Sequence, residues 1–238
     1  MLPTTPCRIL KPVFSSSCSI FLILFVGLAA PRVLIADKQT SQPATARKPQ
    51  KIVFLGDSLT AGYGLREEQA YPALIGSKLH SEGYQHVKVI NAGVSGSTTA
   101  SGLSRLKWQL KGNPTHLVLA LGANDGLRGF ELSTTEKNLR SIIKSAQNRN
   151  IQVLLAGMKV PPNYGEAYGR QFNDMFTRLS GMKNLSHYPF LLEKVAGQKH
   201  LNLADGIHPN PEGHKVIAEG LYPVVKKFLE LADARAKP

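Results

Sequence analysis

Residues 51–64 read KIVFLGDSLTAGYG, an apolar run that ends at glycine and a cluster of small polar side chains. A short run of branched and aromatic residues bounded by glycine predicts a β-strand. Similar runs follow at residues 86–90 (HVKVI), 115–121 (THLVLAL) and 151–156 (IQVLLA). The last two runs are continuous enough to be buried on both faces, as strands of a parallel sheet are.

The segments between these strands have the period of helices. The clearest helix is predicted from Ser133 to Asn148, where Ser133 and Glu136 fit a capping box. Its apolar residues recur on one face: Leu139, Ile142, Ile143 and Ala146. A second stripe predicts a closing helix, which Pro223 should start or kink, and comprises Leu221, Val224, Val225, Phe228 and Leu229. Strands that alternate with helices predict an α/β fold with a parallel sheet covered on both faces.

The composition fits one compact domain, because 42% of the 238 residues are hydrophobic. The two cysteines, Cys7 and Cys18, both lie near the N-terminus. The rest of the chain therefore has no disulfide framework, no cysteine-ligated metal site and no cysteine nucleophile.

The N-terminal residues resemble a targeting segment. Arg8 and Lys11 precede the uncharged stretch IFLILFVGLAA at residues 20–30, which predicts a signal peptide over residues 1–36. An uncleaved membrane anchor is the alternative. Residues 37–50 lack large apolar side chains and predict a flexible linker, so the folded domain is expected over residues 51–238. The protein is accordingly expected in the periplasm or outside the cell.

The chain is strongly basic, with 29 Lys and Arg residues against 16 Asp and Glu residues. Residues 1–36 contribute three of the basic residues and none of the acidic ones, so the processed chain stays basic. The charges are dispersed rather than clustered in runs, which argues against nucleic acid as a partner. Peripheral contact with an anionic membrane or envelope polymer, and a merely solvated surface, both remain open.

Loops rich in glycine, serine and asparagine follow the first three predicted strands, at residues 56–64, 91–99 and 122–126. Such residues are also ordinary in turns. Ligands of parallel sheets bind beyond the carboxyl ends of the strands, where these loops meet. A fourth segment, DGIHPNP at residues 205–211, places Asp205 three residues before His208. Asn210 and Pro211 predict the N-cap and first turn of the closing helix.

Ser58, Asp205 and His208 have the chemistry of a nucleophilic triad. His208 would take the proton of the Ser58 hydroxyl, and Asp205 would hold the imidazole in the required tautomer. The negative charge of a tetrahedral intermediate needs hydrogen-bond donors. The backbone N–H groups of Ser58 and Gly96 and the side-chain amide of Asn124 are the expected donors.

The GDSL block at Ser58, the glycine loop at Gly96, the GAND block at Asn124 and the DxxH pair at Asp205 resemble the four blocks of the SGNH (GDSL) hydrolase superfamily. Residues 122–129 (GANDGLRG) and 162–165 (PNYG) are similar to its bacterial arylesterase, lysophospholipase and thioesterase I branch.

The resemblance implies a flavodoxin-like three-layer sandwich with a five-stranded parallel sheet over residues 51–238. It also implies a Ser58 nucleophile and neither cofactor nor metal, and it favours Gly96 over Gly93 as the glycine donor, because the stretch SGST at residues 95–98 aligns with the second block. The sequence around Ser58 lacks the Gly-x-Ser-x-Gly pattern of α/β-hydrolases, which disfavours that other fold.

The resulting hypothesis is an exported serine esterase that acts through an acyl-enzyme on Ser58. Its expected substrates are aryl or short and medium acyl esters and lysophospholipids, and a thioester is accessible to the same chemistry. The alternatives are a deacetylase of acylated envelope sugars and a non-catalytic protein that binds an acyl or glycan ligand.

The sequence also predicts the positions of residues outside the triad and its donors. Tyr164 is expected to line the substrate pocket, and Asp57 to organise the loop around Ser58 by hydrogen bonding. Trp108 is expected in the core, and His214 is expected to face solvent. Helical spacing also assigns one set to the core: Phe172, Met175, Phe176 and Leu179.

Overall fold

A computed structural model describes residues 48–235 of the chain. The predicted signal peptide, residues 1–36, and most of the predicted linker lie outside the described residues. Within residues 48–235, no helix combines the length and apolar composition that crossing a bilayer requires.

The centre of the domain is a five-stranded sheet in which every paired strand is parallel to its neighbour, in the order β2-β1-β3-β4-β5. This is the strand order of flavodoxin-like folds. The predicted fold class is therefore confirmed. The strands are β1 Gln50–Gly56, β2 Val87–Gly93, β3 His116–Ala120, β4 Gln152–Ala156 and β5 Leu185–Tyr188.

Burial follows the position of each strand in the sheet. Every residue of β3 is buried and β1 has one exception, whereas the edge strand β2 is largely half-exposed. Phe54 in β1 pairs with Asn91 of β2 on one side and with Val118 of β3 on the other. The apolar runs that predicted central strands thus form the core of the sheet.

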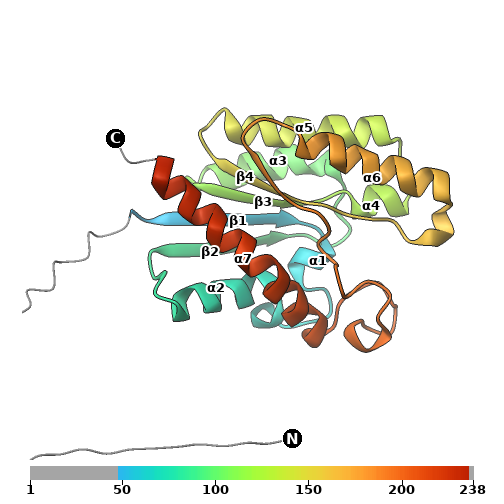
Figure 1. Ribbon diagram of the computed structural model, residues 1–238, viewed down its shortest axis with the longest axis horizontal. Helices are drawn as coiled ribbons and strands as arrows, with labels where there is room; N and C mark the ends of the chain where they lie inside the picture. Colours follow the sequence, from blue (N-terminus) through green and yellow to red (C-terminus); the bar gives the residue numbers. More distant parts are fainter. Residues whose placement is uncertain (1–47, 236–238) are drawn as a thin grey trace, which may run out of the picture. The chain divides into compact units, whose positions relative to one another are not determined.

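Helices cover both faces of the sheet, as predicted (Figure 1). α2 and α7 pack together on one face, and α3, α5 and α6 lie on the other. The α-helices are α1 Ser58–Ala61, α2 Tyr71–Ser81, α3 Thr99–Leu110, α4 Ala123–Leu127, α5 Leu132–Gln147, α6 Glu166–Ser180 and α7 Pro211–Arg235. The short 3₁₀ helices are η1 Glu67–Gln69, η2 Pro162–Tyr164 and η3 Lys199–Leu201.

The predicted capping box of α5 is wrong. The helix begins at Leu132 and its N-cap is Glu131, so Ser133 lies inside the first turn. The Glu131 carbonyl accepts from the N–H groups of Thr134 and Thr135, which starts the helix earlier than the Ser133 pattern implied. The apolar stripe of this helix is buried as predicted.

The closing helix α7 begins where the sequence predicted. The Asn210 side chain accepts a hydrogen bond of 3.0 Å from the Gly213 N–H, which is the bond of an N-cap. Pro223 lies inside α7 rather than at its start. Pro223 has no N–H, so one carbonyl in the preceding turn of α7 lacks its helical hydrogen bond. Because Pro223 is exposed, that carbonyl lies on the solvent side of the helix.

Gly157, which follows β4, packs tightly against the segment after β5. Its N–H donates to the Tyr188 carbonyl at 2.8 Å, and an added Cβ would lie 2.2 Å from the Pro189 carbonyl oxygen. We expect Gly157→Ala to lower the free energy of unfolding by about 1–3 kcal/mol, because a backbone atom must move. Urea denaturation measures the change.

Gly169→Ala is the matched control. Gly169 lies within α6, and an added Cβ would be 3.9 Å from its nearest neighbour, the Val160 side chain. This variant should gain about 0.5–1 kcal/mol, because alanine is the better helix former. Equal stability of Gly157→Ala and the wild type would contradict the packing argument.

Candidate active site

Ser58 lies at the carboxyl end of β1, as the first residue of the short helix α1. The Asp57 side chain caps this helix by accepting a hydrogen bond of 3.0 Å from the Leu59 N–H. The expected loop-organising role of Asp57 is therefore confirmed. Ser58 is 9% exposed, so its position is set by the surrounding backbone.

His208 brings the C-terminal part of the chain to Ser58. Its Nε2 lies 2.9 Å from the Ser58 Oγ, and its Nδ1 lies 2.7 Å from Asp205 Oδ2. A carboxylate accepts only, so Nδ1 carries the hydrogen in this arrangement and Nε2 is left to accept from the hydroxyl. The structure thus brings together all three side chains of the predicted triad.

Asp205 is held in the ionised form. Its Oδ1 accepts from the N–H groups of Ile207 and His208, each at 3.0 Å. These two backbone bonds, reinforced by the His208 side chain, lower the pKa of Asp205 to about 2. The imidazole therefore faces a negative charge over the whole neutral pH range.

The loop that carries Asp205 and His208 is fixed on both sides. The Leu203 N–H donates to the His208 carbonyl at 2.7 Å, and Asn202 pairs with Pro209 in an antiparallel bridge. The Asn210 cap then attaches the loop to α7. Tyr63, just after α1, lies against the His208 ring with 4.5 Å between ring centroids.

The predicted oxyanion donors follow the carboxyl ends of three strands: Ser58 begins α1, Gly96 lies in the loop after β2, and Asn124 lies in α4 after β3. Gly96, in the loop between β2 and α3, is exposed and has φ +76°, which favours glycine. Within residues 48–235, the backbone N–H groups of Ser58 and Gly96 donate to no other protein group. The Asn124 amide donates to the Ser97 carbonyl at 3.0 Å, which leaves its second hydrogen for a ligand.

Gly93 is the weaker candidate for this role. Its N–H donates to the Asn91 side chain at 3.0 Å, so it is already used. An added Cβ at Gly93 would lie 2.2 Å from the Ala61 nitrogen. Gly93 is therefore needed for the close packing of β2 against α1.

Two tyrosines and an arginine, which the sequence reasoning did not connect, hold the short helix α4. The Tyr164 hydroxyl donates to the Leu127 carbonyl at 2.8 Å. The Tyr168 hydroxyl lies within hydrogen-bond distance of two carbonyls, that of Gly126 in α4 at 3.4 Å and that of Phe130 just after α4 at 3.3 Å. Arg128 donates to the Gly96 carbonyl at 3.2 Å, which joins α4 to the glycine loop. The position of Asn124 at the start of α4 thus depends on contacts from both sides.

Asp125 has a structural role in the same region. It is 2% exposed and accepts from both the N–H and the hydroxyl of Thr99, at 2.9 and 2.6 Å. Thr99 is the first residue of α3, where a negative charge is favourable. Asp125 therefore fixes α3 to α4 and does not face the Ser58 hydroxyl.

Asp57 carries a second buried carboxylate close to the site. Burial raises its pKa to about 6, although the Leu59 bond and the nearby positive charge of Arg105 act in the opposite direction. Its Oδ2 has no hydrogen-bond partner among residues 48–235.

The expectation that His214 faces solvent is wrong. The residue is 1% exposed, and its Nδ1 accepts from the Tyr71 N–H at 3.1 Å. Burial lowers the pKa of His214 to about 4, so its imidazole is neutral at physiological pH. His214 thus joins α7 to α2.

Trp108 does not lie in the core, contrary to the prediction, because it is 65% exposed. The predicted core set of α6 is buried: Phe172, Met175, Phe176 and Leu179. Among residues 48–235, no group of three or more His, Cys, Asp or Glu side chains is arranged to hold a metal ion.

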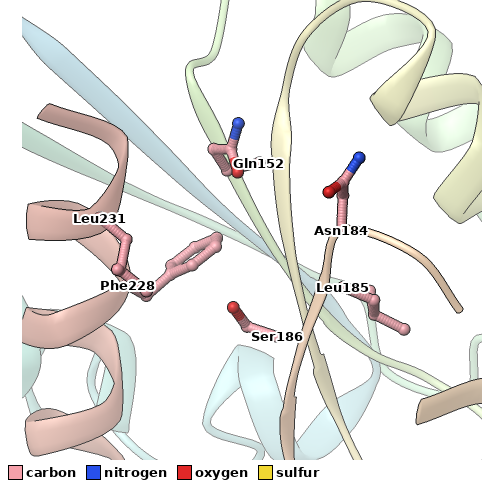
Figure 2. A pocket seen from close by; sticks show the side chains of 6 residues that line it. All are labelled: Gln152, Asn184, Leu185, Ser186, Phe228 and Leu231. Atoms are coloured by element: carbon pink, nitrogen blue, oxygen red, sulfur yellow. The ribbon is translucent and has the colours of Figure 1, made fainter. Parts of the chain in front are cut away.

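A hollow of about 250 Å³ lies at the opposite end of the sheet, where β4 and β5 begin (Figure 2). Phe228 and Leu231 of α7 form one side of it, and Gln152, Asn184 and Ser186 line the other. Because Ser58 follows the carboxyl end of β1, this hollow is separate from the candidate active site.

A model of the GDSL-like lipase/acylhydrolase family matches residues 54–216. The chain belongs to this family. The match spans Ser58, Gly96, Asn124, Asp205 and His208. As a GDSL family member, the protein is a serine esterase and hydrolyses carboxylic esters.

Named relatives agree with the family match. An arylesterase of Vibrio mimicus is 40% identical over 74% of this chain and 88% of its own length. Thioesterase 1/protease 1/lysophospholipase L1 of Escherichia coli K12 is 37% identical over 71% of this chain and 79% of its own. The crystal structure of esterase EstA from Pseudoalteromonas sp., inhibited by monoethylphosphonate, superposes with a TM-score of 0.72 at 36% identity, covering 76% of this chain and 99% of that one.

The hydroxyl of Tyr164 provides a test of how α4 is held in this GDSL esterase. Tyr164→Phe keeps the ring and leaves the Leu127 carbonyl without its donor. We expect kcat to fall about three- to tenfold with KM nearly unchanged, because the loss of one hydrogen bond of about 1 kcal/mol lets α4 and Asn124 shift. Steady-state kinetics with p-nitrophenyl butyrate measure both constants.

Tyr84→Phe is the matched control, because the Tyr84 hydroxyl donates to Glu230 at the other end of the sheet. Its kcat and KM should equal those of the wild type. A rise in KM alone in Tyr164→Phe would mean that the hydroxyl binds substrate instead.

Proposed function

We propose that this GDSL esterase cleaves its substrates through an acyl-enzyme formed on Ser58. The contact that supports this proposal most directly is the 2.9 Å approach of His208 Nε2 to the Ser58 Oγ. The 2.7 Å contact between His208 Nδ1 and Asp205 completes the relay. With all three groups in contact, no member of the triad is missing, which is what a non-catalytic binding protein on this fold would have lacked.

In the proposed first step, the Ser58 oxygen attacks the carbonyl carbon of the ester while His208 Nε2 takes the hydroxyl proton. The π electrons of the carbonyl become a negative charge on its oxygen. The N–H groups of Ser58 and Gly96 and the Asn124 amide stabilise that charge. The intermediate then collapses, the C–O bond to the alcohol breaks, and His208 gives its proton to the departing alkoxide.

In the second step, water attacks the acyl-enzyme and His208 takes one of its protons. The new tetrahedral intermediate uses the same donors, and its collapse returns the proton to Ser58 and releases a carboxylic acid. Asp205 stays ionised throughout and stabilises the transient positive charge on the imidazole.

The proposed substrates are aryl or short and medium acyl esters and lysophospholipids, with thioesters accessible to the same chemistry. The names of two relatives support this range. One is an arylesterase, and the other is named thioesterase 1/protease 1/lysophospholipase L1. Tyr164 is half-buried beside α4, and we propose that its ring contacts the substrate.

We further propose that the esterase works outside the cytoplasm. The support is the sequence alone, in which two basic residues precede the uncharged stretch at residues 20–30. Whether residues 1–36 are removed or retained as an anchor distinguishes a released enzyme from a tethered one.

Replacing the proposed nucleophile is the direct test. Ser58→Ala should lower kcat/KM for p-nitrophenyl acetate, butyrate and octanoate at least about 10³-fold, because the acyl-enzyme cannot form. Ser104→Ala is the control, since Ser104 is an exposed serine of α3. Activity of Ser58→Ala at the wild-type level would identify a different nucleophile.

The low pKa of Asp205 leads to a second prediction. The pKa of its carboxyl group, about 2, keeps Asp205 ionised at every pH from 5 to 9, and its charge is lost only as the pH falls towards 2. Asp205→Asn should therefore lower the maximal kcat reached within that window by a factor on the order of 10³–10⁴, because the imidazole loses the carboxylate that orients it and stabilises its protonated form.

The measurement is a pH–rate profile of both proteins, with Asp174→Asn on the exposed face of α6 as the control. An Asp205→Asn protein whose maximal kcat equals that of the wild type would contradict the assigned role.

A further inference from the structure

Trp108 is the single tryptophan of the chain and lies in the last turn of α3. Its side chain is 65% exposed, although Leu106 and Leu110 of the same helix are buried. The core under α3 is therefore filled without Trp108. Tryptophan is enriched at interfaces, because its ring is apolar and its indole N–H is polar.

The surroundings of Trp108 are positively charged. Lys107 and Lys111 are exposed on the same helix end, and the Lys111 ammonium lies 4.3 Å from the centroid of the Trp108 ring. Lys51 reaches the same place by donating to the Gly112 carbonyl. Residues 83–124 contain no Asp or Glu at all. We call Lys51, Lys107, Trp108 and Lys111 the Trp108 patch.

The patch lies at the end of the sheet where the strands begin. Lys51 is the second residue of β1, and α3 ends at Leu110 just before β3 starts at His116. β1 begins with Gln50 at this same end, so the preceding chain is connected to the domain there. Ser58 follows the opposite end of β1, so the patch and the candidate active site are on opposite ends of the sheet.

The sequence before β1 contains the uncharged stretch of residues 20–30. This stretch is connected to the domain at the end that carries the Trp108 patch. Retention of residues 20–30 in a bilayer would therefore tether the domain by the end that exposes the Trp108 indole and the three lysines. Indole rings prefer the boundary between lipid head groups and acyl chains, and lysine side chains extend to anionic head groups.

We propose that the Trp108 patch docks on the surface of an anionic lipid bilayer, with the indole ring at the head-group level and the three lysines on anionic lipids. A single aromatic side chain lacks the stacking series of a nucleic-acid surface, which makes lipid the favoured occupant. Docking in this way leaves Ser58 on the side of the domain that faces away from the bilayer.

Because Trp108 is the single tryptophan, the tryptophan fluorescence of the full-length protein reports on the Trp108 patch alone. The protein is mixed with vesicles of phosphatidylcholine alone or of phosphatidylcholine with phosphatidylglycerol, and its tryptophan emission is recorded. We expect a larger blue shift and stronger quenching by brominated lipid with the anionic vesicles than with the zwitterionic ones. Lys107→Glu/Lys111→Glu should weaken the anionic response at least about tenfold.

Lys194→Glu/Lys199→Glu is the matched charge control, because both lysines are exposed in the segment that carries His208. It changes the net charge equally and should keep the response. A second control moves the reporter: Trp108→Phe/Phe130→Trp places the tryptophan beside α4, where Phe130 is 45% exposed, and this protein should give no shift.

Three results would overturn the proposal. The first is an absent shift, or an equal shift with zwitterionic vesicles. The second is an equal loss of response in both lysine pairs, or a shift of the relocated tryptophan, since binding would then not involve the patch. The third is a shift that depends on protein concentration without lipid, which would identify a second copy of the chain as the occupant.

Discussion

The contact between the Ser58 hydroxyl and the His208 imidazole depends entirely on the tertiary fold, because 150 positions separate the two residues. Ser58 is fixed by β1 and by the Asp57 cap of α1. His208 is fixed by the tight turn around Asp205 and by the Asn210 cap of α7. Since α7 packs against α2, the geometry of the site is a consequence of how one layer of helices sits on the sheet.

Parallel strands determine where the remaining groups can meet. All carboxyl ends of the strands point to one edge, so the loops after β1, β2 and β3 are neighbours without any special sequence signal. The bonds from Asn124 to Ser97, from Arg128 to Gly96 and from Thr99 to Asp125 then join the loops to each other. These bonds make the predicted oxyanion donors part of a connected polar network.

The fold could be predicted from the sequence wherever a single element carried the signal. Continuous apolar runs predicted the buried strands β3 and β4, and the stripe of α5 predicted its buried face. The strand β5 has only four residues, LSHY, and its pattern alone did not predict it. The prediction for His214 was wrong because periodicity does not reveal its partner, the Tyr71 N–H. The prediction for Trp108 was wrong because leucines of the same helix already fill the core beneath it.

The residues of the candidate site could likewise be predicted only where their own types and order carried the signal. Ser58, Asp205 and His208 stand out because their residue types and order match a known chemistry. Tyr168 and Arg128 do not, because their bonds go to backbone carbonyls, which every residue possesses and no sequence pattern marks.

The order of the groups along the chain has a consequence for biosynthesis. On the proposed assignment, a nascent chain that has emerged only as far as residue 200 has its serine but neither the carboxylate nor the base, so it cannot yet hydrolyse an ester by this mechanism.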